Sequence, residues 1–343
     1  MAENSSILSF KKLLLGLIIF LMLVLLLETM LFSKAYLVAD KSTICSVFKK
    51  IMMERHHSAD VVIFGDSRTL AIDAKSLEES FGGNITAYNY SLYNIGTDLL
   101  LYLSLHKYLS YCKRPELIIA STSIEHFCQG NTDVFNRGPE NYEFKRFRRF
   151  FSIWDIWGEI PRSKKKIFLA TYLTNAIPSY DYAFWIIQSL KDHAVLSSLR
   201  HANNIIQHMQ QTNGQIIYNE DAVANDVDIA GSLPTDPLIK NIKNFERFVA
   251  LCDKNDIRIV FFLMPIHHMR YKKMAELGWF DYIDQEMDRL QRKYRRFEYH
   301  KIGDFNYEGK YFGDWSHLNK KGADKFNWEL KSYARNTLEG IVK

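Results

Sequence analysis

Two short motifs near opposite ends of the chain hold the residue types that nucleophilic catalysis needs. Gly65-Asp66-Ser67 ends an apolar run at 60–65, and Asp314-x-x-His317 lies close to the C-terminus. A serine hydroxyl is a weak nucleophile until a histidine accepts its proton. A carboxylate on the other imidazole nitrogen fixes the tautomer of that histidine. Asp314 and His317 are close enough in sequence to be held in one loop, so the two motifs could form a Ser-His-Asp triad.

Each motif also has an ordinary structural explanation. Serine is common in turns and at helix N-termini, so Gly-Asp-Ser alone is more often a turn or a cap than an active site. Asp314 could cap a helix that begins near Asn319. The pair carries more weight than either half, because ligands of an open α/β sheet meet the carboxyl ends of its strands.

The elements that would position these residues alternate along most of the chain. β-rich runs predict strands, and apolar residues at helical spacing predict helices. We expect strands at 60–65, 84–90, 115–120, 257–265 and 297–305, and helices at 96–112, 244–252, 272–295 and 320–337. This alternation predicts a mostly parallel sheet with helices on both faces. Ser67 would then follow the first strand.

The order and context of both motifs resemble the SGNH (GDSL-type) hydrolase superfamily over about residues 60–337. The block Asp314-Trp-Ser-His-Leu-Asn-Lys-Lys-Gly322 is the most specific part of this resemblance. The resemblance implies a three-layer α/β/α, flavodoxin-like fold. It also implies Ser67 as the nucleophile, His317 as the general base and Asp314 as the carboxylate that orients His317.

The oxyanion-binding residues of that superfamily are only partly recognisable here. Its members use a Gly after the second strand and an Asn after the third as donors to the negative charge of the tetrahedral intermediate. Asn94 or Gly96 could occupy the first position. The third block reads Ser-Thr-Ser-Ile-Glu at 121–125 and has no Asn, so Ser123 is the candidate substitute. Three further residues near strand ends are candidates for substrate binding: Arg68, Glu125 and His126.

Residues from about 130 to 240 interrupt the alternation of strands and helices. We expect a largely helical insertion, because this segment has no strong strand pattern. Basic and aromatic residues gather at 144–151, 154–166 and 180–185. They are either solvated charges on an ordinary insertion or an interfacial surface, since Lys, Arg and aromatic side chains suit a lipid headgroup region or a partner.

The segment 13–33 has the composition of a membrane helix. Its 20 residues at 13–32 contain one charge, Glu28, and would span about 30 Å as a helix. A cleaved signal peptide and a buried core helix are the alternatives, but the run is long, lacks a small-residue cleavage site and has no polar face. Lys11 and Lys12 favour an N-terminus inside the cell.

The membrane helix sets the expected domain organisation. We expect a cytoplasmic tail at 1–12, a single-pass anchor at 13–33, a tether at 34–59 and an SGNH-like domain at 60–343. With the N-terminus inside, that domain would lie outside the cytoplasm, in the bacterial periplasm or at the cell surface.

Composition excludes several other classes of protein. Only 7 Pro and 16 Gly among 343 residues exclude collagen-like and low-complexity chains. Four Cys exclude a disulfide-dense scaffold, although a Cys112–Cys128 bridge stays open. A net charge of +5 is too small to indicate nucleic-acid binding.

No metal site and no cofactor are expected from the sequence. His56-His57 and His267-His268 are adjacent pairs, and neighbouring side chains on a strand point to opposite faces. No Cys/His zinc spacing or glycine-rich phosphate loop is present. His267 and His268 follow the fourth predicted strand, so they could instead line the cleft near Ser67.

The anchor, a Gly-Asp-Ser-Arg motif and a late Asp-x-x-His motif together resemble SGNH-like proteins of bacterial envelope acylation, such as those of alginate O-acetylation and teichoic-acid D-alanylation. The resemblance implies a serine acyl hydrolase or acyltransferase acting on ester-linked acyl groups of an envelope polysaccharide or related polymer. It also implies a membrane-bound O-acyltransferase as a partner. The missing Asn leaves open a catalytically weak or inactive accessory protein that binds such a polymer or acyltransferase. A structural tether unrelated to hydrolases would require both motifs to be accidents.

Overall fold

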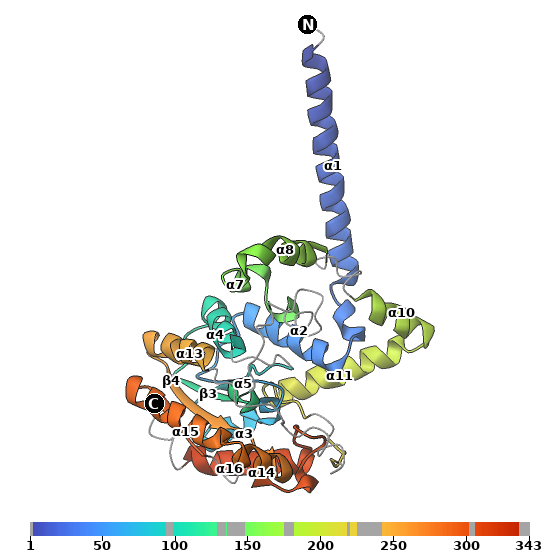
Figure 1. Ribbon diagram of the computed structural model, residues 1–343. Coiled ribbons are helices and arrows are strands. Elements are labelled where there is room, and N and C mark those ends of the chain that lie inside the picture. The colour runs from blue at the N-terminus through green and yellow to red at the C-terminus, as the bar shows by residue number, and fades with distance from the viewer. Residues whose placement is uncertain are drawn as a thin grey trace.

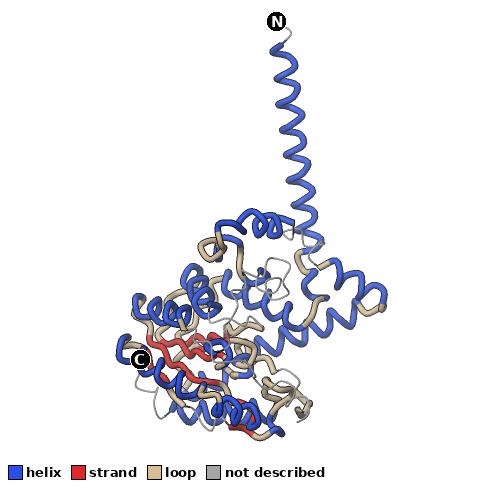
Figure 2. Tube along the Cα trace, in the orientation of Figure 1, coloured by secondary structure: helices blue, strands red, loops and turns tan. Residues whose placement is uncertain are grey.

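The computed structural model describes residues 3–93, 99–128, 135, 148–174, 182–217, 220–224, 242–301 and 306–335. Within these ranges the side chains at 3–11, 25, 29, 31, 128 and 174 are not described. The chain forms a folded body from which one long helix, α1 (Glu3–Phe32), projects (Figures 1 and 2).

A five-stranded parallel sheet forms the centre of the body, with the strand order β2-β1-β3-β4-β6. Its strands are β1 (Val61–Gly65), β2 (Ala87–Asn89), β3 (Leu117–Thr122), β4 (Arg258–Leu263) and β6 (Phe297–Tyr299). Val61 of β1 is in register with Ala87 of β2 and Leu117 of β3. The chain adds β2 on one side of β1 and all later strands on the other, so the topological switch point lies between β1 and β3.

Alternate residues of β1 point into two separate hydrophobic cores. Val62 and Phe64 belong to the larger core, to which α4 (Leu99–Tyr111), α13 (Lys243–Lys254) and α15 (Trp279–Lys293) contribute. Val61 and Ile63 belong to a smaller core with α3 (Ala74–Ser80) and α16 (Lys320–Tyr333). The predicted α/β fold, with a parallel sheet flanked by helices, is therefore confirmed.

The five strands overlap the five predicted ranges, but the last is shorter than expected. β6 ends at Tyr299, and residues 302–305 lie outside the described part of the chain. The next described residues form β7 (Asn306–Tyr307), which pairs with β5 (Ile266–His267) in a separate small sheet. The chain therefore leaves the main sheet before it reaches the loop of the second motif.

The prediction of a single helix at 272–295 is wrong. The structure has two helices there, α14 (His268–Glu276) and α15, with Gly278 between them. Gly278 has a φ of +71°, a left-handed conformation that glycine adopts readily and that interrupts a right-handed helix. The helices expected at 96–112, 244–252 and 320–337 correspond to α4, α13 and α16.

The tether expected at 34–59 is part of the folded body. A short 3-10 helix, η1 (Ala35–Val38), leads into α2 (Lys41–Glu54), where the Asp40 carboxylate accepts from the Thr43 amide at 2.7 Å. Ile44 and Met53 of α2 are fully buried. Lys49 is fully buried too and donates to the carbonyl of Ser91 at 2.8 Å. Packing of apolar residues at helical spacing therefore orders this segment, which the sequence had suggested was a linker.

The described parts of the insertion are helices and connecting loops. They include α7 (Ile153–Ile156), η3 (Arg162–Lys164), α8 (Lys165–Thr174), α10 (Ala183–Lys191) and α11 (Val195–Gln211). After α11 the chain runs beside β2 and the turn η2 (Thr69–Ala71), since Asn89 donates to the Asn213 carbonyl and Ile216 donates to the Leu70 carbonyl, each at 2.8 Å. Residues 213–216 of the insertion therefore contact the segment that follows Ser67.

The helix α1 stands apart from the rest of the molecule. It is 30 residues long, and its large apolar side chains are exposed, from 45% at Val24 to 72% at Leu13. Among the residues that the structure describes, none of the helices combines the length and the apolarity that crossing a membrane requires.

Candidate active site

The first motif forms a tight turn at the carboxyl end of β1. A Cβ on Gly65 would lie 2.2 Å from Thr69 Oγ1 and 2.5 Å from the Ser121 carbonyl oxygen, so only glycine lets β1 and β3 lie this close here. The Asp66 carboxylate accepts from the amide of Arg68 and from the amide of Ser123, each at 2.9 Å. The Asp66 carboxylate therefore joins the turn that carries Ser67 with the loop that follows β3.

The second motif forms a closed loop before α16. Phe312 and Leu318 make an antiparallel bridge, and the Gly313 amide donates to the His317 carbonyl at 2.9 Å. Within the loop, Asp314 Oδ1 accepts from the amides of Ser316 and His317, each at 2.8 Å. The loop is thus held by its own backbone and by the Asp314 carboxylate.

Asp314 does not cap the following helix. The cap of α16 is Asn319, whose side-chain oxygen accepts from the Gly322 amide at 3.0 Å. The Asn319 side-chain amide donates to the carbonyls of Lys310 at 2.9 Å and Ala222 at 3.0 Å. Asn319 therefore joins the loop, α16 and Ala222 of the insertion, and the cap of α16 does not involve the Asp314 carboxylate.

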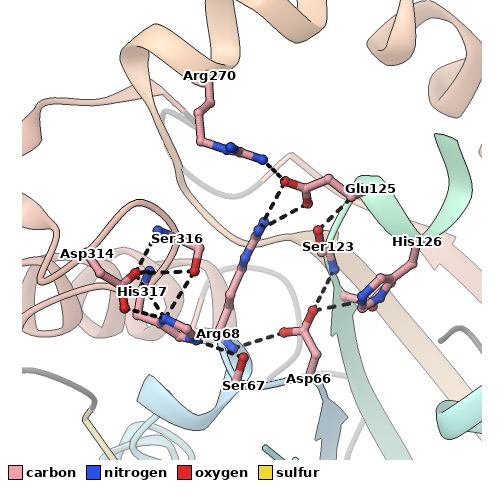
Figure 3. A network of polar contacts seen from close by, with 11 residues as sticks. Asp66, Ser67, Arg68, Ser123, Glu125, His126, Arg270, Asp314, Ser316 and His317 are labelled. Atoms are coloured by element: carbon pink, nitrogen blue, oxygen red, sulfur yellow. Dashed lines mark hydrogen bonds and ion pairs between the residues drawn. The ribbon is translucent and has the colours of Figure 1, made fainter. Parts of the chain in front are cut away.

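The structure brings Ser67, His317 and Asp314 together (Figure 3). Ser67 Oγ lies 2.8 Å from His317 Nε2, although the two residues are 250 positions apart. On the other side of the ring, His317 Nδ1 lies 2.8 Å from Asp314 Oδ2. The His317 side chain is 19% exposed and that of Asp314 is 24% exposed. These three side chains form a partly accessible Ser-His-Asp array at the switch point between β1 and β3.

The Asp314 carboxylate is held in its ionised form. Burial works to raise its pKa, but the hydrogen bond and charge of His317 and the amides of Ser316 and His317 outweigh burial and lower the pKa to about 2. An ionised Asp314 favours a hydrogen on His317 Nδ1 and leaves Nε2 as an acceptor facing Ser67. In this tautomer Nε2 is the nitrogen that can accept the proton of the Ser67 hydroxyl.

A buried ion cluster lies beside the array. Arg68 Nη2 lies 3.0 Å from Glu125 Oε2, and Arg270 of α14 donates to the other Glu125 oxygen (Figure 3). The charges of Arg68 and Arg270 outweigh burial and lower the Glu125 pKa to about 2. Burial lowers the pKa of Arg270, whereas the carboxylates around Arg68 overcome burial and raise the pKa of Arg68. The two guanidinium groups share the Glu125 carboxylate, and Asp66 and Asp314 lie near enough to Arg68 to stabilise its charge further.

Trp315 connects this cluster to the loop of the second motif. Its ring centroid is 4.5 Å from the guanidinium carbon of Arg270 and 5.9 Å from that of Arg68. Trp315 stands between Asp314 and His317 in sequence, so the same loop that holds His317 also covers the two arginines. The turn of Ser67, the loop after β3 and the loop of His317 are therefore joined by one set of contacts.

The other predicted site residues have different positions. Arg68 is buried in the ion cluster. The amide of Ser123 donates to Asp66, and its hydroxyl accepts from the Glu125 amide at 3.2 Å. His126 Nδ1 lies 3.8 Å from Asp66. Asn94 and Gly96 lie outside the described residues.

His267 does not line an open cleft. It is fully buried in β5, accepts from the Met269 amide at 3.3 Å and packs edge-on against Phe312, with the ring centroids 5.4 Å apart. Among the described residues, no cluster of three His, Cys, Asp or Glu side chains could hold a metal ion. Cys112 is a buried free thiol.

Sequence reasoning missed the contributions of Arg270, Trp315 and Asp66. Trp315 lies within the Asp314-x-x-His317 motif, and Asp66 lies within the Gly-Asp-Ser motif, so their positions in the sequence were a signal for both. Arg270 had no such signal, because its partner Glu125 is 145 residues away.

Comparisons with known proteins find little in sequence. No known protein family and no curated protein matches the chain. One similar solved structure is that of a candidate platelet activating factor from Streptococcus pneumonia, with 12% sequence identity and a TM-score of 0.39. The match covers 91% of this chain and 98% of that one.

Proposed function

We propose that the protein is an SGNH-type serine acyl hydrolase or acyltransferase, anchored in a membrane, that acts on ester-linked acyl groups of an envelope polysaccharide or related polymer. The observation that carries the proposal is the contact of Ser67 Oγ with His317 Nε2 at 2.8 Å, with Asp314 on the opposite ring nitrogen. The array stands at the carboxyl ends of the strands, where α/β folds bind ligands.

In the proposed reaction Ser67 Oγ attacks the carbonyl carbon of an acyl ester while His317 Nε2 takes the hydroxyl proton. The tetrahedral intermediate collapses when His317 returns this proton to the leaving alcohol oxygen, and an acyl-Ser67 ester remains. Water or the hydroxyl of an acceptor then attacks that ester, again with His317 as the base, and Ser67 regains its proton. Water as the second nucleophile gives hydrolysis, and a sugar hydroxyl gives acyl transfer.

The proposal includes membrane attachment through α1, with residues 1–12 in the cytoplasm and the folded body outside it. It is supported by the exposed apolar side chains between Leu13 and Leu27 and by Lys12 at the N-terminal side of this stretch. Alkaline extraction of membranes tests the attachment, since an embedded helix resists extraction. Labelling of an engineered cysteine at exposed Ser197 by an impermeant reagent in intact cells tests the orientation.

Turnover of an acyl-ester reporter by the full-length protein in detergent tests the catalytic proposal. Ser67→Ala should reduce turnover by at least about 10³-fold, because the triad acts as a unit. Ser332→Ala is the matched control, since it removes a hydroxyl from α16 whose partner among the described residues is the Trp328 carbonyl of the same helix. Equal rates for wild type, control and Ser67→Ala would remove the mechanism.

A second function, binding of the polymer or of a membrane-bound O-acyltransferase without catalysis, is favoured by one observation. Both the amide and the hydroxyl of Ser123 already have partners within the protein, so this substitute for the missing Asn is engaged elsewhere. Complementation of envelope acylation in cells separates the two functions. The catalytic function requires that Ser67→Ala fails to complement, and the binding function requires that it succeeds.

A further inference from the structure

A cavity of about 490 Å³ opens where α1 meets the folded body. Ser33 and Tyr36, which follow α1, form one wall, and the others are formed by residues of α2, the segment 148–152, α7 and α8, together with Tyr182. Figure 1 shows α8 beside the lower end of α1, α7 at the far end of α8, and α2 below them. The cavity is separate from the Ser67 array, because none of its lining residues belongs to the array or to the ion cluster.

The described lining of this cavity carries three cationic side chains and no carboxylate: Lys50, Arg148 and Arg149. Lys50 lies 3.9 Å from Glu54, which also pairs with the buried Lys107 at 3.3 Å. Burial lowers the pKa of Lys50. Glu54 and Asp155, the carboxylates near Lys50, both pair with Lys107, and neither lines the cavity.

The rest of the wall is aromatic and apolar. Trp154 and Leu173 line the cavity and are also 75% and 65% exposed, so they extend from its wall into the surroundings. Tyr172 lines the cavity as well, and its hydroxyl donates to the Phe151 carbonyl at 3.0 Å. A guanidinium-rich wall beside exposed Trp and Leu side chains is suited to a ligand with an anionic head and an apolar tail.

Exposed apolar side chains continue on the neighbouring helix. Phe184, Ile187 and Leu190 of α10 are 67%, 51% and 59% exposed, and α10 packs against η1, directly after α1. These side chains add exposed apolar surface near the C-terminal end of α1, on the side opposite α8 (Figure 1). If α1 lies in a bilayer, the mouth of the cavity lies at the level of the headgroups, where Trp, Tyr, Arg and Lys are favoured.

We propose that this cavity binds the phosphate headgroup of an anionic phospholipid while the acyl chains lie along α1. The inference rests on the membrane attachment in the proposed function and does not depend on catalysis by Ser67. Arg148, Arg149 and Lys50 supply the charged donors to the phosphate oxygens. Trp154 and Leu173 contact the glycerol and the upper part of the acyl chains.

The test uses the full-length chain in nanodiscs of phosphatidylcholine with a minor fraction of phosphatidylglycerol, followed by native mass spectrometry of retained lipid. Wild type should retain phosphatidylglycerol preferentially. The double variant Arg148→Gln/Arg149→Gln should lower this retention about tenfold, as expected from losing charge-assisted hydrogen bonds. Arg162→Gln/Lys166→Gln is the matched control, because it removes the same charge from exposed residues of the same insertion outside the cavity.

Arg149 also donates to Thr43, so the double variant could lose stability. Lys50→Gln, which keeps that contact, should lower retention in the same direction, and melting curves of each variant check the fold. Equal retention by wild type and by folded cavity variants would overturn the inference. Displacement of the lipid by millimolar inorganic phosphate would also overturn it, because the site would then recognise free phosphate. A chain that does not enter nanodiscs at all would overturn the membrane attachment and this inference together, whereas loss of Ser67 activity would affect neither result.

Discussion

The indole ring of Trp315 lies over the guanidinium group of Arg270, with 4.5 Å between the ring centroid and the guanidinium carbon. Trp315 belongs to the loop of Asp314 and His317, and Arg270 belongs to α14 and pairs with Glu125. The contact therefore joins the loop that holds His317 to the ion cluster beside Ser67. We expect the orientation of His317 to depend on this contact.

Trp315→Ala should lower kcat/KM for an acyl-ester reporter by about tenfold, since cation–π contacts contribute on the order of 1–2 kcal/mol when partly desolvated. The fall should be mainly in kcat, because Trp315 positions the loop that holds His317. The melting temperature should change little, as Trp315 is 42% exposed. Trp315→Phe should restore part of the activity.

Trp328→Ala is the control for this change, because Trp328 is 69% exposed on α16 and has no arginine beneath it among the contacts described. A similar loss of kcat in both variants would show that removal of an indole, and not the contact with Arg270, causes the effect.

Glu125→Gln should destabilise the protein by roughly 3–5 kcal/mol, because Arg68 and Arg270 would then be two buried like charges without a carboxylate between them. Urea unfolding followed by fluorescence measures this change. Glu298→Gln is the matched control, since Glu298 pairs with Arg258 at 3.0 Å but is 30% exposed, and its loss should cost less than about 1 kcal/mol. Equal effects of both substitutions would contradict the importance of burial.

The same carboxylate should make stability depend on pH in the acid range. The Glu125 pKa is lowered from 4.5 to about 2 in the folded protein, so between these values the unfolded chain binds the extra proton. Stability from this group is therefore complete above about pH 4.5 and is lost as the pH falls toward 2. Urea midpoints measured from pH 6 down to the acid limit of folding (about pH 3) should fall more steeply for wild type than for Glu125→Gln. Parallel pH profiles would contradict this assignment.

Gly65→Ala should destabilise the protein by at least about 2 kcal/mol, because the new methyl group would overlap the backbone oxygen of Ser121. Activity should fall in the protein that still folds, since relief of the overlap must move the turn that carries Ser67. Gly158→Ala is the control, as nothing lies within 4 Å of a Cβ at that position. Thermal unfolding of both variants checks the prediction, which a stable, fully active Gly65→Ala protein would contradict.

The sheet and the central array could be predicted from the sequence because their signals are local. The apolar run at 60–65 and the Gly-Asp-Ser turn adjoin in the chain, and Asp314 and His317 share one loop. Given parallel strands, residues that follow β1 must lie at the same edge as those that follow β3. The second motif follows β7, outside the main sheet, so its position beside Ser67, 250 residues away, was predicted from the resemblance of the two motifs to one superfamily and not from strand order.

Other features depended on contacts between distant segments. The apolar residues of α2 recur at helical spacing, which is a local signal, but their packing beneath elements later in the chain, which buries Ile44 and Met53, could not be read from that spacing. The helix break at Gly278 depends on its left-handed backbone, whereas a single glycine inside a helical pattern is often tolerated. The pairing of Arg270 with Glu125 joins two charged residues that are common types on any surface, so their burial could not be read from sequence.

The most direct test of the central claim is the mass of the protein after reaction with a fluorophosphonate, which adds covalently only to an activated serine. We expect wild type to gain one adduct and peptide mapping to place it on Ser67. Ser67→Ala and His317→Ala should remain unlabelled, and Ser332→Ala should label like wild type. An unlabelled wild-type protein, or undiminished labelling of Ser67→Ala, would contradict the account that Ser67, His317 and Asp314 form a working nucleophile.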